Sequence, residues 1–308
     1  MPHMFEATRA LRSALAMEKK GNDHKALRLF HHALSLCPRH PDLLNHYGEF
    51  VEKNNLILAD YYYSQALIFS PGHEQALLNH LRVLPCVEKL DRMHLKEVDR
   101  KKRKFGCNAF EEIVKMEHCR FIYHCAAMEG NTIDLHQTNM IIEHGLIASG
   151  KEHSEIVGLN DAVMYIRNCN TVTLDTILEI HRRVLGRVDQ MEAGRVRNVP
   201  VCVGDYHPPG PLELDTILKD FIIWLNSHES LHPIQYAALA HHKLVKIHPF
   251  ADGNGRTARL LMNLILLRNG FPIVTIPVKE RNVYFEYLQL ANDGDYRPFV
   301  RYIHVERC

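Results

Sequence analysis

The sequence predicts an all-α protein with one small β-hairpin, and three observations carry that prediction. A small–aromatic–small pattern recurs at a fixed interval near the N-terminus. From residue 105 onward, almost every segment repeats its apolar side chains at helical spacing. The exception is the valine-rich stretch 199–204, which is short and is followed by prolines. We therefore expect helices throughout, interrupted by a single hairpin.

The N-terminal pattern consists of two sets of residues with the same spacing. The sets are Ala26, Phe30, Ala33 and Pro38, and then Ala59, Tyr63, Ala66 and Pro71. At this spacing the small and aromatic side chains share one helix face, and the proline ends the helix. Such helix pairs resemble tetratricopeptide (TPR) repeats, whose period is about 34 residues. We expect two TPR-like repeats over residues 5–73, with an ordinary pair of helical hairpins as the alternative.

Residues 74–104 are expected to form capping and linker helices. This segment ends in a basic run, residues 100–104, directly after Glu97 and Asp99. A short basic run beside acidic residues is typical of a solvated helix face. The whole chain is nearly balanced, with 37 Lys and Arg against 36 Asp and Glu. We therefore expect no nucleic-acid partner and no general attraction to an anionic membrane.

Cysteine spacing and hydropathy exclude two further classes. The 8 cysteines show neither a CxxC pair nor zinc-site spacing, so we expect free thiols. A membrane span needs about 20 apolar residues, and the longest apolar stretch, 260–267, is far shorter. We expect no membrane contact from this sequence, with an anchor upstream of it left open.

The residues that carry chemistry lie between two expected helices, 233–247 and 256–269. The connecting segment and the next turn read HPFADGNGRTAR over residues 248–259. A glycine-rich turn that leads into a helix N-terminus presents unpaired N–H groups and the positive end of the helix dipole. Arg256 and Arg259 would share one face of that helix, and two guanidinium groups suit a polyphosphate.

Two side chains of the same segment supply other chemistry. Asp252 is a hard oxygen ligand suited to Mg²⁺, and His248 can accept a proton near neutral pH. Other phosphate motifs fit less well, since no GxxxxGK[ST] occurs. The dinucleotide-type spacing of Gly253, Gly255 and Ala258 follows a helical stretch, whereas that motif needs a preceding strand.

This segment resembles the Fic family signature, HxFx[DE]GNGRxxR, at every specified position. Supporting matches are EAGR at 192–195 and ANDGD at 291–295. The resemblance extends from about residue 105 to the C-terminus and implies a helical Fic domain over residues 105–308. With the repeats in front, the chain is similar to the animal Fic proteins that carry TPR repeats and modify the Hsp70 chaperone of the endoplasmic reticulum.

The resemblance implies a role for each residue of the signature. His248 would be the general base that deprotonates a Ser, Thr or Tyr hydroxyl, and Phe250 would pack beneath the loop. Asp252 would bind Mg²⁺, with Mn²⁺ as a substitute, and ATP would be the substrate. The nucleotide-binding residues would be Gly253, Asn254, Gly255, Arg256, Arg259, Tyr284 and Asn292, with the last two at the adenine and ribose. The flap on which a target docks would comprise Val199, Pro200, Val201, Cys202, Val203 and Gly204.

Glu129 stands before Gly130 at the expected end of a helix over about 111–129. A carboxylate there opposes the helix dipole, and a cationic partner would relieve it. The segment resembles the Fic inhibitory motif, [ST]xxxE[GN], with Cys125 in place of Ser or Thr. The resemblance implies that Glu129 pairs with Arg259, inhibits AMP transfer and helps to remove AMP from the target. Because cysteine is a weak donor, we expect a less firmly held helix. The alternative is an incidental surface glutamate.

We therefore expect a protein adenylyltransferase that also catalyses de-AMPylation. The expected partners are an Hsp70 chaperone, engaged by the repeats, and a second copy in a homodimer. The expected location is the endoplasmic reticulum, through a membrane-anchored full-length protein in the unfolded protein response, with the cytosol and nucleus left open. The alternatives are a phosphotransferase on the same fold and a TPR scaffold with a vestigial Fic domain.

Overall fold

The computed structural model describes residues 2–104, 110–145, 150–204, 206–227 and 230–304, and these residues form helices and connecting turns without a β-strand. The all-α prediction is therefore confirmed for this part of the chain. The chain divides into two compact units. The first unit comprises the residues up to Lys96 together with Asp293–Asp295, and the remaining residues belong to the second.

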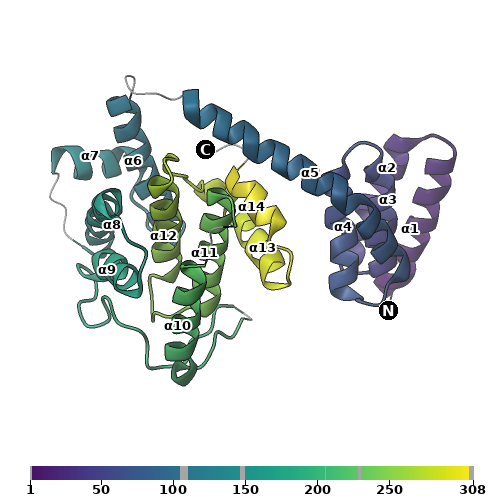
Figure 1. Cartoon of the computed structure of the whole chain (residues 1–308). Helices are drawn as coiled ribbons and strands as arrows, with labels where there is room; N and C mark the ends of the chain where they lie inside the picture. Colours follow the sequence, from purple (N-terminus) through teal and green to yellow (C-terminus); the bar gives the residue numbers. More distant parts are fainter. Residues whose placement is uncertain (1, 105–109, 146–149, 205, 228–229, 305–308) are drawn as a thin grey trace. The chain divides into compact units, whose positions relative to one another are not determined.

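The first unit is built from paired helices. They are α1 (Pro2–Lys19), α2 (Asp23–Leu36), α3 (Pro41–Glu52), α4 (Leu56–Phe69) and the first part of α5 (Glu74–Lys104) (Figure 1). Helix α1 packs against α2, and α3 against α4. Asn22 and Asn55 accept backbone N–H groups of Lys25 and Leu58 and so cap α2 and α4. Pro41 begins α3, where its missing N–H costs no helical hydrogen bond.

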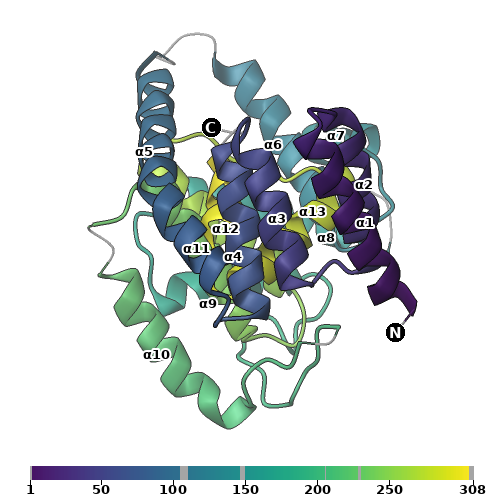
Figure 2. The same ribbon diagram turned by 90° about the vertical axis from the view of Figure 1, so that its right-hand side faces the viewer.

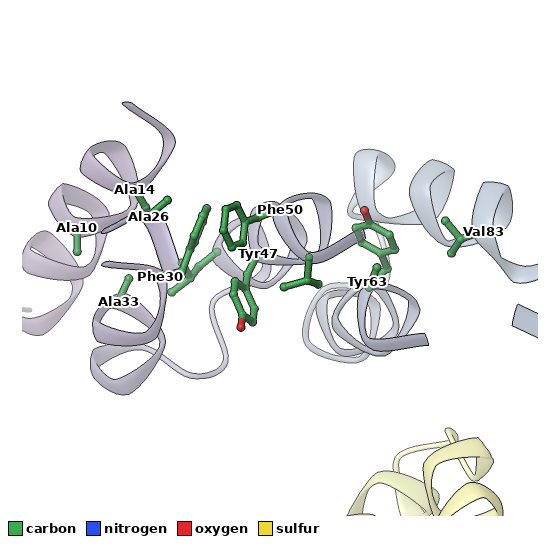
Figure 3. Packing of buried hydrophobic residues seen from close by; sticks show 12 residues of the cluster. Ala10, Ala14, Ala26, Phe30, Ala33, Tyr47, Phe50, Tyr63 and Val83 are labelled. Carbon is green, nitrogen blue, oxygen red and sulfur yellow. The ribbon is translucent and has the colours of Figure 1, made fainter. Parts of the chain in front are cut away.

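The side chains expected to face inward do form the core of this unit. They are Ala26, Phe30, Ala33, Ala59, Tyr63 and Ala66, and each has an exposed fraction of 0%. The Phe30 ring packs against Tyr47 and Phe50 with centroid distances of 5.5 and 5.0 Å (Figure 3). The predicted helix faces are thus confirmed, and their identity as TPR repeats stays a prediction.

Helix α5 differs from the expected pair of capping and linker helices. It runs without a break from Glu74 to Lys104, with Pro85 inside it. The division between the two units falls on this helix after Lys96, whereas the sequence placed the start of the second domain at residue 105.

The second unit is arranged around α12 (Asn254–Arg268), which packs against α6, α8, α9 and α11. The other elements are α6 (Phe110–Ala127), α7 (Leu135–His144), α8 (Lys151–Asn168), α9 (Leu174–Leu185), η1 (Pro211–Glu213), α10 (Leu214–Leu225), α11 (Pro233–Ile247), η2 (Val278–Glu280), α13 (Arg281–Asn292) and α14 (Arg297–His304). Helices α11 and α12 lie side by side in both views (Figures 1 and 2). Every residue from Arg256 to Leu266 is buried, so the predicted anion-binding turn leads into the central helix.

The hairpin expected at Val199–Gly204 is not confirmed. In the described part of this segment no strand forms, and one antiparallel bridge joins Val203 to Tyr206 through N–H···O bonds of 2.9 and 3.0 Å. Pro200 and Pro208 have no N–H to donate to a ladder, which limits pairing to this single bridge. Alternating valines therefore produce an irregular loop here.

Among the described residues, none of the helices combines the length and the apolar character that a membrane span requires.

We predict that Gly48→Ala destabilises the first unit. A methyl group at Gly48 would lie 2.6 Å from Cε1 of Tyr63, whose ring is fully buried. Overpacking of this kind costs about 1–3 kcal/mol of unfolding free energy. The measurement is thermal unfolding by far-UV circular dichroism. Trp224, the only tryptophan, lies in the second unit. The unfolding transition of that unit, followed by Trp224 fluorescence, should therefore be unchanged.

Gly72→Ala is the matched control, because a methyl group there would meet no atom within 4 Å. Equal transitions for the two variants would contradict the packing described for Gly48.

Candidate functional site

His248 ends α11 in the left-handed backbone region, with φ 51°. This conformation is strained for a residue with a Cβ atom. Arg197 holds the backbone there: its Nε donates to His248 O at 2.8 Å, and its backbone N donates to Pro249 O at 2.9 Å. The same buried guanidinium donates to Val199 O and Pro209 O at 2.9 and 2.6 Å. One side chain therefore fixes both the backbone of His248 and the two ends of the 199–209 loop.

The His248 imidazole is arranged to act as a base. Its Nδ1 lies 3.3 Å from Val245 O, a contact that requires the proton on Nδ1 and leaves Nε2 bare. Burial lowers the pKa of His248, Arg197 lowers it further, and the charges of Glu129 and Asp252 oppose that shift only in part. The imidazole is therefore neutral near pH 7 and can accept a proton.

The loop after His248 is held by hydrogen bonds to side chains. Asn254 Oδ1 accepts the Phe250 N–H at 2.9 Å, and Asn254 Nδ2 donates to Phe250 O at 2.8 Å. The Phe250 ring stacks on His181, with centroids 3.7 Å apart and an interplanar angle of 5°. His181 Nε2 bonds to Asp252 O at 2.9 Å, and its Nδ1 accepts the Gly194 N–H at 2.9 Å. Burial lowers the pKa of His181 to about 4, so its ring is neutral.

The loop leads into an open helix N-terminus. Gly253 caps α12 with φ 78°, a value that glycine adopts without strain. The first N–H groups of a helix have no partner within it, and they carry the positive end of the helix dipole. The Gly253 N–H itself meets Asp252 Oδ1 at 2.5 Å. The predicted anion site is thus present as a geometric feature.

Arg256 and Asp252 form the charged rim of this site. Arg256 is 3% exposed, and its guanidinium contacts Asp252 Oδ1 at 3.0 Å and Glu155 Oε1 at 3.4 Å. Burial would raise the pKa of Asp252, but Arg256 and the Gly253 N–H together hold it below its usual range. The ionised Asp252 side chain is 62% exposed, so its carboxylate can reach a cation.

A single exposed carboxylate fits Mg²⁺ bound together with a nucleotide. Over the described ranges, no group of at least 3 His, Cys, Asp or Glu side chains gathers that could hold a metal by itself. Mg²⁺ in nucleotide sites takes one or two carboxylates and completes its shell with phosphate oxygens and water. Asp252 supplies a donor of that kind.

The structure brings Glu129 and Arg259 together, as expected. Arg259 Nη2 donates to Glu129 Oε1 at 2.5 Å and to Cys125 O at 3.1 Å, and Arg259 Nε donates to Cys125 Sγ at 3.3 Å. Burial opposes the charge on Glu129, yet Arg259 holds the pKa of this carboxyl below its usual range. A methyl group at Gly255 would lie 2.6 Å from Glu129 Oε1. The carboxylate therefore lies directly against the first turn of α12.

Two details of the Glu129 segment differ from expectation. Helix α6 ends at Ala127, so Glu129 lies in a turn after the helix and not at its last residue. The sulfur of Cys125, expected to act as a weak donor, accepts a hydrogen bond from Arg259. The turn is held at both ends, because Asn131 Nδ2 donates to Glu155 Oε2 at 2.8 Å and Arg281 Nε donates to Met128 O at 3.1 Å.

Tyr284 and Asn292, expected at the adenine and ribose, both contact histidines of α11, and Tyr284 also lies beside Arg259. Tyr284 is 1% exposed, and its hydroxyl lies 3.0 Å from His241 Nε2 in the core. Asn292 Oδ1 bonds to His242 Nε2 at 2.9 Å. In this structure both side chains make contacts within the helical core.

Sequence reasoning missed His181 and Arg197. His181 does occupy a recognisable position, because it falls between Ile177 and Val184 on the buried face of α9. A polar residue among the apolar residues of a buried helix face is expected to be buried and hydrogen-bonded. Arg197 follows the EAGR match closely, but nothing in its spacing distinguishes it from a surface arginine.

The fold and site define a helical domain with an anion-type site at a helix N-terminus. A family model described as the Fic/DOC family matches residues 171–266. Over 97% of its length the chain is 47% identical to the protein adenylyltransferase Fic of Aedes aegypti and 48% identical to that of Drosophila melanogaster. It spans 63% and 64%, respectively, of the lengths of these relatives.

The same likeness is found among solved structures. A fragment of Fic-1 from C. elegans matches with a TM-score of 0.87 and 39% identity, over 97% of this chain and 94% of that one. The chain belongs to the Fic family.

We predict that Arg197→Lys destabilises the second unit, because an ammonium group cannot make the forked contacts of the guanidinium. The expected loss is about 3 kcal/mol of unfolding free energy, as for a buried charged donor whose acceptors lose their partner. Urea unfolding followed by Trp224 fluorescence measures it. Arg195→Lys, at an exposed arginine nearby, should leave the transition in place. A similar midpoint for both variants would show that Arg197 does not hold the loop.

Proposed function

We propose that this protein transfers AMP from ATP to a hydroxyl group of a target protein and that Glu129 inhibits the reaction. The observation that carries the proposal is the convergence at one helix N-terminus of free N–H groups, two buried arginines, an exposed carboxylate and a neutral imidazole. The names of the relatives support the same activity. A vestigial domain is disfavoured, because His248, Asp252, Arg256 and Arg259 all retain side chains suited to the reaction.

We assign a role to each group on this proposal. His248 Nε2 accepts the proton of the target hydroxyl as its oxygen attacks the α-phosphorus of ATP and pyrophosphate leaves. The N–H groups at the start of α12 stabilise the negative charge that develops on the phosphate oxygens. Arg256 and Arg259 bind the β- and γ-phosphates. Asp252 would hold Mg²⁺, which when bound neutralises phosphate charge.

Glu129 opposes this reaction by occupying the anion site. Its carboxylate forms an ion pair with the guanidinium of Arg259 and lies against Gly255. A γ-phosphate cannot pair with Arg259 while Glu129 does, and two anions at one site repel each other. ATP then binds in an unproductive orientation. The same carboxylate lies where it can orient a water molecule for the reverse reaction, the removal of AMP.

Three further properties are proposed from the resemblance of the sequence to the animal Fic proteins that carry TPR repeats. They are an Hsp70-class target recruited by the TPR-like repeats, a homodimer, and a location in the endoplasmic reticulum. The 199–209 loop is proposed as the surface on which the target backbone docks, by analogy with the Fic flap. Val199 and Val203 on this loop are 50% and 42% exposed, so two apolar side chains are available there.

We predict that Glu129→Gly raises AMP transfer by about tenfold or more, since it removes a charged competitor from the site. The measurement is transfer of label from α-labelled ATP to a purified Hsp70 or to the protein itself. Glu129→Gln should give a smaller increase, because the amide keeps a hydrogen bond to Arg259 and loses only the charge. An unchanged rate in Glu129→Gly would contradict inhibition by Glu129.

Labelled ATP also separates the alternatives. Transfer of label from the γ-position would indicate a phosphotransferase, and no transfer from either position would indicate a scaffold. His248→Ala in the Glu129→Gly background should abolish transfer while nucleotide binding remains.

The fall of kcat/KM on the acidic side of the pH profile should report the protonation of His248. Because its pKa is lowered, the neutral base persists below the ordinary histidine value of 6.5, and kcat/KM should fall only at more acidic pH. In the Glu129→Gly variant, a charge that raises this pKa is gone, so the inflection should lie below 6.5 and not above it. The profile is measured on that variant at saturating Mg²⁺. An inflection above 6.5 would show that His248 is not the titrating base.

A further inference from the structure

His181, on α9, contacts most of the loop 249–253 that precedes α12, although the two segments are far apart in the sequence. Its ring stacks on Phe250 with centroids 3.7 Å apart, and its Nε2 bonds to Asp252 O at 2.9 Å. A methyl group at Gly253 would lie 3.3 Å from the same ring. The residue is 0% exposed, so these contacts account for much of its surroundings.

The hydrogen bonds of His181 fix its tautomer. The Gly194 N–H donates to Nδ1 at 2.9 Å, so Nδ1 carries no proton. The single proton of the neutral ring is therefore on Nε2 and is donated to Asp252 O. The ring thus offers one donor and one acceptor to two different segments of the chain.

The bond to Asp252 O holds the carbonyl end of a peptide for which two orientations are sterically allowed. Gly253 has φ 78°, and a glycine at this position accepts either orientation of the preceding peptide, as turn types I and II show. In a trans peptide the N–H and C=O point in opposite directions. With Asp252 O directed to His181, the Gly253 N–H points to the other side, where it meets Asp252 Oδ1. The opposite orientation would present a carbonyl oxygen to the phosphates.

We propose that His181 is a positioning residue that selects the orientation of the Asp252–Gly253 peptide and thereby sets the affinity of the site for a nucleotide triphosphate. This inference rests on the proposed function, because it assumes that phosphates bind at the N-terminus of α12. A purely structural role, in which His181 ties the Gly194 turn to α9, is the competing explanation.

Two substitutions separate the two hydrogen bonds. In His181→Gln, the amide nitrogen lies the same number of bonds from Cβ as the imidazole Nε2, so the donor to Asp252 O is retained. In His181→Asn, the amide oxygen corresponds to Nδ1, so the acceptor for the Gly194 N–H is retained and the donor to Asp252 O is lost. Both variants lose the ring and its stacking on Phe250, which makes them a matched pair.

The experiment measures ATP binding by isothermal titration calorimetry with Mg²⁺, in the Glu129→Gly background. We expect His181→Gln to bind within about threefold of that parent and His181→Asn to bind about tenfold or more weakly, the usual worth of one hydrogen bond. Unfolding followed by Trp224 fluorescence should show both variants folded, with similar midpoints. Substitution of the exposed His136 by Asn should leave the affinity unchanged.

Other outcomes overturn the inference. Equal affinities for the Gln and Asn variants, or weaker binding by Gln, would show that the bond to Asp252 O does not set the affinity. If one variant fails to fold, a crystal structure of the other with ATP decides the matter. His181→Gln should keep Asp252 O turned toward α9, and His181→Asn should show the peptide turned over. Failure of the Glu129→Gly parent to bind ATP would instead refute the proposed function.

Discussion

The anion site depends on carbonyl groups that are turned into the protein. The loop between α11 and α12 directs its oxygens at protein donors, namely His248 O and Pro249 O at Arg197, Phe250 O at Asn254, and Asp252 O at His181. Since the C=O and N–H groups of a trans peptide point apart, the Gly253 N–H points away from His181, and it meets Asp252 Oδ1. The side chains of Arg197, Asn254 and His181 therefore fix the direction of the peptide groups in this loop.

The pairing of Glu129 with Arg259 follows from the burial of the arginine. Arg259 is 2% exposed, and a buried guanidinium needs an anionic or carbonyl partner at all times. Cys125 O and Cys125 Sγ each accept an N–H group of this guanidinium, and Glu129 supplies the opposing charge. Gly255 permits the close approach, because any side chain there would overlap the carboxylate. Under the proposed function, inhibition by Glu129 and binding of a γ-phosphate would therefore be alternative states of this one arginine.

Much of this arrangement follows from the sequence, but only where the relevant contacts are local. Glycine and arginine spacing over residues 253–259 places the N–H groups and cations correctly, because both depend on a single helix start. The hairpin predicted from the valine alternation at 199–204 was wrong, because a strand also needs a partner strand and the prolines restrict pairing there. Arg197 and His181 were missed because their partners lie 51 and 71 residues away. Spacing carries no information about contacts of that range.

The charges around α12 also bear on which nucleotides the site favours. In this structure both arginines already have carboxylate partners, Arg256 with Asp252 and Glu155, and Arg259 with Glu129. Binding a phosphate group therefore exchanges one ion pair for another, so its net electrostatic gain is small. A ligand that engages both guanidinium groups would compete with Asp252 and with Glu129, and a chain of phosphates would offer an anionic group to each arginine. Affinity should therefore depend on the length of the phosphate chain more than on the base, whose expected contacts, Tyr284 and Asn292, are engaged with histidines of α11.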